Sequence, residues 1–294
     1  MIRGAFPVMI TPMNKDQSVD WQGLRSNVNF YIAQGVRGLI AGGSTGEFVS
    51  LTREERMKLV ETVVEEANGR VPVVAGTAAE TTQQTIEYTR HAQQNGAAAA
   101  MVINPYYMKP KEEEIFHHFA LLTEAVDLPI ILYNNPWTSG IDMSIDLMLK
   151  IHRELPTVVA VKESSGDIRK LRDLIRLSNG TFQGWCGWDD LAMESFLVGA
   201  EGWVSVAGNV IPKLVTDLHT TAVEQGDWKK GWEIYQQMLP LCHMIESSGK
   251  LVQVVKTAMD KIGQAGGPAR SPRMMLNEEE TQRLETALKT LQLI

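Results

Sequence analysis

The sequence predicts an α/β fold, a (β/α)8 TIM barrel with a C-terminal helical extension. Three observations predict it: eight short apolar runs recur along the chain, segments with apolar residues at helical spacing separate them, and the alternation stops past residue 225. Near-continuous apolar strands separated by helices are typical of a parallel sheet covered on both faces. Eight such units match a barrel, whereas the alternative, a doubly wound sheet, rarely needs eight evenly spaced units.

The strands are expected within the apolar runs, and helices are expected between them. The runs span residues 4–10, 38–43, 71–77, 97–103, 128–134, 157–163, 182–187 and 202–208. Helical spacing is clear at 20–35 and 52–69. Ser50 or Thr52 is expected to cap the second of these helices, and Asn68 and Gly69 to end it.

Three adjacent glutamates at 112–114 follow Pro110 and suggest catalytic carboxylates at first sight. They also suit the first turn of a helix, where negative charge is favourable. We therefore interpret them as a solvated helix start.

The chain beyond residue 225 no longer alternates and predicts three helices, at 227–246, 250–263 and 277–294. We expect them to form an appended helical layer and not a second enzyme domain. The predicted organisation is a barrel over residues 1–225 and a C-terminal helical layer over 226–294.

The charge and the cysteine content exclude several classes of function. The net charge is −7 and the pI is about 5.5, with no basic stripe, which argues against nucleic acid and against an anionic membrane as partners. Cys186 and Cys242 match no metal spacing and are expected to be reduced thiols. We find neither a signal-peptide pattern nor a membrane-length apolar run, so a cytoplasmic location is expected.

Lys162 ends the apolar run at 157–163 with no turn residue before it. Lysine is rarely buried unless it is paired or functional. An inward lysine above apolar neighbours is partly desolvated, which favours the neutral amine that attacks a carbonyl to form a Schiff base. The alternative is a salt-bridged lysine at a strand end.

Tyr133 ends the preceding strand, one strand–helix repeat before Lys162. Inward side chains at the same height on adjacent strands can meet, because parallel strands lie about 4.8 Å apart. A phenol beside an amine can shuttle protons during imine formation. The alternative is a core tyrosine with its hydroxyl at the rim.

The loop "GGSTGE" at 42–47 predicts an anion site. Glycines such as Gly43 let backbone N–H groups approach a ligand, and Ser44 and Thr45 add hydroxyl donors. The loop lacks the Lys-Ser/Thr ending of a nucleotide-binding P-loop, so a single carboxylate fits better than a triphosphate.

The motifs "GSTGE", "YNNP" and "VKESSGD", in this order and spacing, resemble the dihydrodipicolinate synthase / N-acetylneuraminate lyase family, and the resemblance covers almost the whole chain. These are Schiff-base lyases and synthases of the TIM-barrel class that act on pyruvate or other 2-oxo acids, usually as tetramers. The resemblance implies that Lys162 forms a covalent imine, so that no other cofactor and no metal is expected. It implies that Tyr133 relays protons, that Ser44 and Thr45 hold the carboxylate, and that Tyr107 joins the relay from a neighbouring subunit through Thr45. Tyr106 is then expected to pack at the subunit interface.

The sequence departs from the synthase branch at the far end of the expected pocket. That branch carries an arginine for the carboxylate of aspartate semialdehyde after "YN-x-P", whereas residues 136–140 here read "PWTSG". We place Trp137, Thr138 and Val206 in the substrate-binding set, with Trp188 as a further candidate. The sequence thus favours aldol cleavage or condensation, dehydration or deamination of a 2-oxo acid.

Two alternatives remain open: a true dihydrodipicolinate synthase, in which Lys109 or Arg270 supplies the cation, and a non-catalytic 2-oxo acid binding or regulatory protein. The six histidines form no metal triad at strand ends. Asp189 and Asp190 are expected to cap the next helix.

Overall fold

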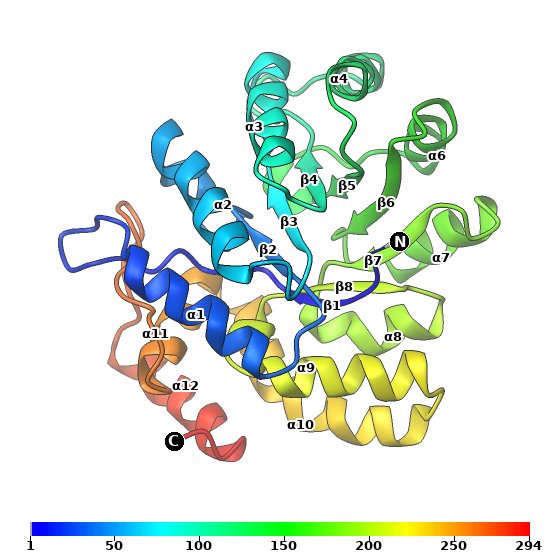
Figure 1. The fold of residues 1–294 in the computed structure, drawn as a ribbon. Coiled ribbons are helices and arrows are strands. Elements are labelled where there is room, and N and C mark those ends of the chain that lie inside the picture. The colour runs from blue at the N-terminus through cyan, green and yellow to red at the C-terminus, as the bar shows by residue number, and fades with distance from the viewer. Residues whose placement is uncertain (1) are drawn as a thin grey trace.

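The computed structural model describes residues 2–294 and shows eight parallel strands with helices around them (Figure 1). The strands are β1 (Gly4–Pro7), β2 (Leu39–Ala41), β3 (Val73–Gly76), β4 (Ala99–Ile103), β5 (Ile130–Asn134), β6 (Val158–Glu163), β7 (Gln183–Cys186) and β8 (Gly202–Ser205). Each lies inside a predicted run, and the predicted TIM barrel is confirmed. Neighbours along the chain are neighbours in the sheet, and β8 pairs with β1.

A single parallel bridge between Val8 and Ile40 nearly closes the barrel between β1 and β2. The Met9 N–H donates to the Ile40 carbonyl at 2.9 Å across the same gap. The carboxyl ends of all strands therefore gather at one end of the barrel, where this fold builds its sites.

The helices α1 to α9 surround the strands (Figure 1). They are α1 (Trp21–Ala33), α2 (Arg53–Ala67), α3 (Thr82–Gln94), α4 (Glu112–Ala125), α5 (Pro136–Ser139), α6 (Ile145–Glu154), α7 (Ile168–Leu177), α8 (Ala192–Leu197) and α9 (Pro212–His219), which continues as a π-helical turn, η4 (Thr220–Glu224). Short 3-10 turns follow β2, β7 and β8: η1 (Phe48–Ser50), η2 (Asp189–Leu191) and η3 (Ala207–Asn209).

The residues predicted to begin and end helices occupy those positions in the structure. Thr52 caps α2 in a capping box with Glu55, and Asn68 ends α2 in a left-handed conformation with φ 47°. The acidic residues 112–114 form the first turn of α4, which confirms their interpretation as a helix start.

The last three helices are α10 (Trp228–Ser247), α11 (Leu251–Lys261) and α12 (Glu278–Thr290). α11 and α12 lie within their predicted segments, and α10 ends one residue past its own. α10 packs on α9 and η4, and α11 and α12 pack on α10. The division into 1–225 and 226–294 stays a proposal, because this layer is tied closely to the barrel, as the site shows below.

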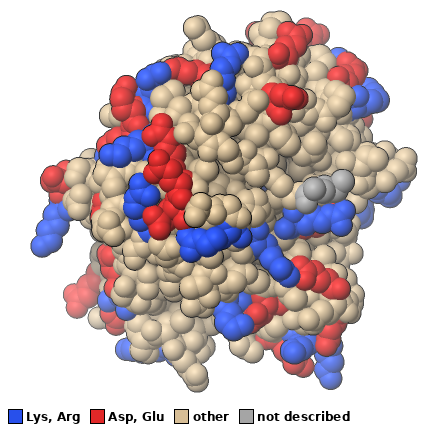
Figure 2. All heavy atoms as spheres, viewed as in Figure 1, with Lys and Arg blue, Asp and Glu red and all other residues tan. Residues whose placement is uncertain are grey.

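Acidic and basic side chains are interspersed on the face shown in Figure 2, with no extended field of one sign there. Within residues 2–294, none of the helices combines the length and the apolar character that a membrane crossing needs.

Candidate active site

Lys162 and Tyr133 meet at the carboxyl ends of β6 and β5. They are register partners, and Lys162 Nζ lies 3.9 Å from the centre of the Tyr133 ring. Both side chains are buried. The two therefore come together as the sequence predicts, but the amine faces the ring and not the phenol oxygen, in a cation–π arrangement.

The Lys162 amine has no carboxylate within 4.0 Å among the described residues, so the salt-bridged alternative is wrong. Its register partner on β7, Trp185, is fully buried and packs edge to face on Phe6 at 5.2 Å. These rings and Ala160, two residues before the lysine, make an apolar floor. Lys162 is therefore a buried lysine, 6% exposed, beside apolar side chains.

The Tyr133 hydroxyl accepts a hydrogen bond from Asn135 Nδ2 at 2.8 Å. Across residues 2–294, no hydrogen bond joins Thr45 to Tyr133. The expected Thr45–Tyr133 link is thus not formed in this structure, because the phenol is turned toward its own loop.

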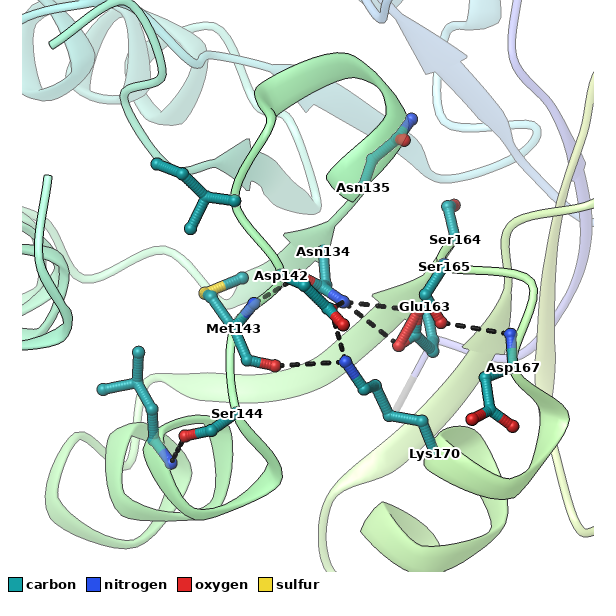
Figure 3. A network of polar contacts seen from close by, with 12 residues as sticks. Asn134, Asn135, Asp142, Met143, Ser144, Glu163, Ser164, Ser165, Asp167 and Lys170 are labelled. Atoms are coloured by element: carbon teal, nitrogen blue, oxygen red, sulfur yellow. Dashed lines mark hydrogen bonds and ion pairs between the residues drawn. The ribbon is translucent and has the colours of Figure 1, made fainter. Parts of the chain in front are cut away.

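A polar network behind the strands fixes the ends of β5 and β6 (Figure 3). The Asn134 amide donates to Asp142 at 3.0 Å and to Glu163 at 3.2 Å, and Lys170 donates to Asp142. Asn134 and Glu163 follow Tyr133 and Lys162 directly, so they point to the opposite side of their strands. Burial raises the pKa of the Glu163 carboxyl. The network therefore holds the two inward side chains in register.

The Tyr133–Lys162 pair opens into a cavity of about 330 Å³ at the carboxyl end of the barrel. The expected residues on its wall are Ser44, Thr45, Tyr133, Trp137, Thr138, Lys162, Trp188 and Val206. A larger hollow of about 1020 Å³ lies outside the barrel against α2, α3 and α4, and it carries none of the expected residues.

Ser44 and Thr45 line the cavity, whereas Gly43 does not. A Cβ at Gly43 would come within 2.7 Å of the Val8 side chain, so packing alone already requires glycine there. Glu47 ends this loop in a left-handed conformation with φ 59°. We call residues 42–47 the hydroxyl loop.

The adjacent residues Tyr106 and Tyr107 have different surroundings, which the sequence does not predict. Tyr106 lines the cavity, whereas Tyr107 is 87% exposed and is not among the residues that line it. Met108 beside it is 67% exposed, and Val49 at the cavity rim is 58% exposed. Among the exposed apolar side chains, Val49 and Trp137 line the cavity.

Arg273 supplies a cation to the cavity that the sequence analysis missed. Its Nη1 lies 3.6 Å from Glu47 Oε2, a long contact. Arg270, in contrast, pairs with Glu55 and donates to the Gln17 and Ser50 carbonyls, and it does not line the cavity. Lys109 does not line it either. No local pattern marks Arg273, because the loop that carries it meets the cavity only in the folded chain.

Glu246 on α10 also lines the cavity and was missed. Its Oε1 accepts the Asp189 N–H at 2.9 Å. The Asp189 side chain does not cap the next helix, and this expectation is wrong: it accepts from Ser205 Oγ at 2.9 Å and from the Val206 and Ala207 N–H groups at 3.2 and 2.6 Å. Burial and the neighbouring Asp189 charge raise the pKa of Glu246 to about 8.

Within residues 2–294, no three or more His, Cys, Asp or Glu side chains gather closely enough to hold a metal ion. Cys186 and Cys242 are both free and buried, and burial raises the pKa of each thiol.

The chain matches the model of the dihydrodipicolinate synthetase family over residues 1–291. It is 36% identical over 294 residues to the 4-hydroxy-tetrahydrodipicolinate synthase of Legionella pneumophila, covering 100% of both chains. The dihydrodipicolinate synthase of Acinetobacter baumannii, solved with pyruvate, superposes with a TM-score of 0.95 at 34% identity over 100% of both chains. YagE, a prophage protein of this family from E. coli K12, also solved with pyruvate, superposes with a TM-score of 0.94 at 30% identity, again over 100% of both chains.

Proposed function

The chain belongs to the dihydrodipicolinate synthetase family, and on that premise we propose that Lys162 binds a 2-oxo acid as an imine. Enzymes of this family are lyases of the class I aldolase type that form a lysine Schiff base with pyruvate and use neither a metal nor another cofactor. The observation that carries the assignment is the position of Lys162: it is the only lysine among the described residues on the cavity wall, and no carboxylate neutralises it. A desolvated, unpaired amine on an apolar floor is a suitable nucleophile.

The neighbouring groups supply the remaining steps. The amine attacks C-2 of the 2-oxo acid, and Tyr133 moves the protons that let water leave the carbinolamine. Ser44 and Thr45, with backbone help at Gly43, hold the substrate carboxylate. Thr45 of the same subunit, together with Tyr107 of a neighbouring subunit, completes the proton path. This path requires the Tyr133 hydroxyl to turn from Asn135 toward Thr45 when ligand binds.

The acceptor end favours a neutral or hydroxylated substrate tail. Trp137 and Thr138 offer an indole and a hydroxyl, and residues 136–140 contain no cation. A second carboxylate buried there without a partner would cost about 2–5 kcal/mol. That corresponds to a loss of about 30- to several-thousand-fold in kcat/KM for aspartate semialdehyde. We therefore propose aldol cleavage or condensation, dehydration or deamination of a 2-oxo acid with a hydroxyl or amine further along, near Trp137, Thr138 and Val206.

A second candidate is a true 4-hydroxy-tetrahydrodipicolinate synthase, and Arg273 favours it. This guanidinium on the cavity wall could grip the second carboxylate in place of an arginine at 136–140. A coupled reductase assay with pyruvate and aspartate semialdehyde separates the two candidates. Weak or absent turnover supports the first. Efficient turnover that Arg273→Met lowers by about 30-fold or more supports the second.

The test of the imine is borohydride reduction in the presence of pyruvate. The expected result is the pyruvate adduct mass on the peptide that contains Lys162. Lys162→Ala and Lys162→Arg should both lose the adduct and the chemical step by several orders of magnitude, since a guanidinium stays protonated. Lys229→Ala, at an exposed position on α10, is the matched control and should trap normally. An adduct on another lysine, or none in the wild type with any 2-oxo acid, contradicts the assignment.

We further propose a homotetramer, because the 2-oxo acid site lies beside the exposed Tyr107 and Met108. The cytoplasm is the proposed location, in keeping with the two free thiols.

A further inference from the structure

Glu246 is the only acidic side chain among the described residues that line the cavity. It comes from α10, in the C-terminal layer, and shares the cavity with Lys162 of the barrel. The positive charge of Lys162 lowers the pKa of Glu246, in opposition to burial, which raises it. A carboxyl group and the amine proposed to form the imine thus line the same cavity.

This carboxyl group is held in a fixed orientation by one of its two oxygens. Oε1 accepts the Asp189 N–H at 2.9 Å, and Asp189 is itself anchored by Ser205 and by two backbone N–H groups. Oε2 has no hydrogen-bond partner in the part of the chain that the structure describes. Glu246 therefore presents one free oxygen on a rigid support, which a group acting on a substrate needs.

A purely structural role does not require a carboxylic acid at this position. A glutamine would accept the same Asp189 N–H and would avoid a second acid beside Asp189. Burial and the acidic neighbours Asp189 and Asp190 disfavour a charge on Glu246, whereas the Asp189 N–H and Lys162 favour it, and the balance raises its pKa. A second acid near a buried acid lowers the stability of the fold, and titratable groups with shifted pKa values concentrate at functional sites.

The other polar side chains at this end of the cavity are less suited to proton transfer. The indole N–H groups of Trp137 and Trp188 are already donated to the Ser165 and Ser164 carbonyls, at 3.0 and 2.8 Å. Arg273 offers N–H donors and no acceptor. Thr138 is exposed at the mouth. Glu246 is the group whose protonation can change near neutral pH.

We propose that Glu246 is a catalytic acid–base residue that transfers the proton of the substrate's C-4 hydroxyl during aldol cleavage of a 4-hydroxy-2-oxo acid. The inference rests on the proposed function, because the 2-oxo acid must be bound as an imine on Lys162. In cleavage, the Glu246 carboxylate takes the proton of the C-4 hydroxyl and the C-4 oxygen becomes an aldehyde carbonyl. The C-3–C-4 bond breaks, and its electron pair forms the C-2–C-3 double bond of the enamine while the iminium nitrogen regains its lone pair. Condensation reverses each step, with Glu246 giving its proton to the aldehyde oxygen.

The test compares Glu246→Gln with the wild type on a set of 4-hydroxy-2-oxo acids, with released pyruvate measured by lactate dehydrogenase. The variant keeps the size of the side chain and the acceptor for Asp189. We expect kcat/KM for cleavage to fall about 10²- to 10⁴-fold, the usual contribution of an acid–base group. Borohydride trapping of pyruvate should change less than about two-fold, because forming that imine involves no C-4 oxygen. Glu246→Asp should recover part of the activity. Glu233→Gln, at an exposed position on the same helix, is the matched control and should behave as the wild type.

The pH profile gives a readout that a structural role would not move. One limb of the wild-type kcat/KM profile should report the titration of Glu246 and should be missing in Glu246→Gln. Wild type that traps pyruvate but cleaves none of the 4-hydroxy-2-oxo acids overturns the inference and leaves the proposed function standing. Equal cleavage by wild type and Glu246→Gln also overturns it. Wild type that fails to trap pyruvate overturns the proposed function first, and the inference with it.

Discussion

Lys256 Nζ lies 2.7 Å from Glu47 Oε1, and both side chains are fully buried. Lys256 belongs to α11 and also donates to the Pro268 carbonyl at 2.7 Å, while Glu47 Oε2 accepts the Arg270 N–H at 3.0 Å. Residues of the C-terminal layer therefore bind Glu47, the last residue of the hydroxyl loop that carries Ser44 and Thr45. The barrel supplies Lys162, and the appended helices hold the loop that is proposed to bind the substrate carboxylate.

Breaking this buried pair should destabilise the protein strongly. Lys256→Met leaves the buried Glu47 carboxylate with only the long Arg273 contact at 3.6 Å. Removing one partner of a buried ion pair costs about 3–5 kcal/mol. Urea unfolding should show the decrease in the free energy of unfolding. Lys261→Met, which breaks the partly exposed pair with Glu285, should change it little. An unchanged urea midpoint for Lys256→Met would mean that the pair contributes no net stability.

Removing the Tyr133 hydroxyl should slow proton transfer without removing the nucleophile. Tyr133→Phe keeps the ring against Lys162 and loses the group that accepts from Asn135. We expect solvent exchange at C-3 of pyruvate, followed by NMR in D₂O, to slow about 10²- to 10⁴-fold. The Lys162 adduct should still accumulate on long exposure to borohydride. Tyr88→Phe, outside the cavity, is the control, and a wild-type exchange rate in Tyr133→Phe would assign the relay to another group.

The stability of the fold should depend on pH through Glu246. Burial and Asp189 raise its pKa from 4.5 to about 8, so the folded state holds a proton that the unfolded state releases between these values. The free energy of unfolding therefore falls as pH rises through this window. Relative to the wild type, Glu246→Gln should become more stable as pH rises from 5 to 8. Denaturant curves at several pH values measure this, and parallel curves for both proteins would show that Glu246 titrates normally.

Tyr107 and Met108 should be covered by a second subunit. We expect sedimentation to show a homo-oligomer. Tyr107→Ala should lower the activity, because it weakens the assembly or interrupts the proton path. Tyr107→Phe, which keeps the apolar ring, should preserve the assembly and lower only the rate. An active monomer in sedimentation at assay concentration would remove the basis for this role.

The sequence determined the fold and the centre of the site. Apolar runs at regular spacing are a local property, so the eight strands were predictable from short windows. Lys162 and Tyr133 were predictable because each ends an apolar strand, and parallel neighbours bring such ends together. The hydroxyls of Ser44 and Thr45 were predictable because glycines surround them in one short loop.

The tertiary structure alone decided what faces this centre. Glu246 and Arg273 lie far along the chain from Lys162, on a helix and a loop whose own patterns do not say which side meets the barrel. Asp189 was expected to cap a local helix, yet its carboxylate satisfies N–H groups after β8. The direction of the Tyr133 hydroxyl is likewise set by Asn135 and not by its strand. Spacing along a chain determines which residues share a strand or a helix face. Contacts between distant segments depend on how whole elements pack. That packing brings the C-terminal layer to the candidate active site.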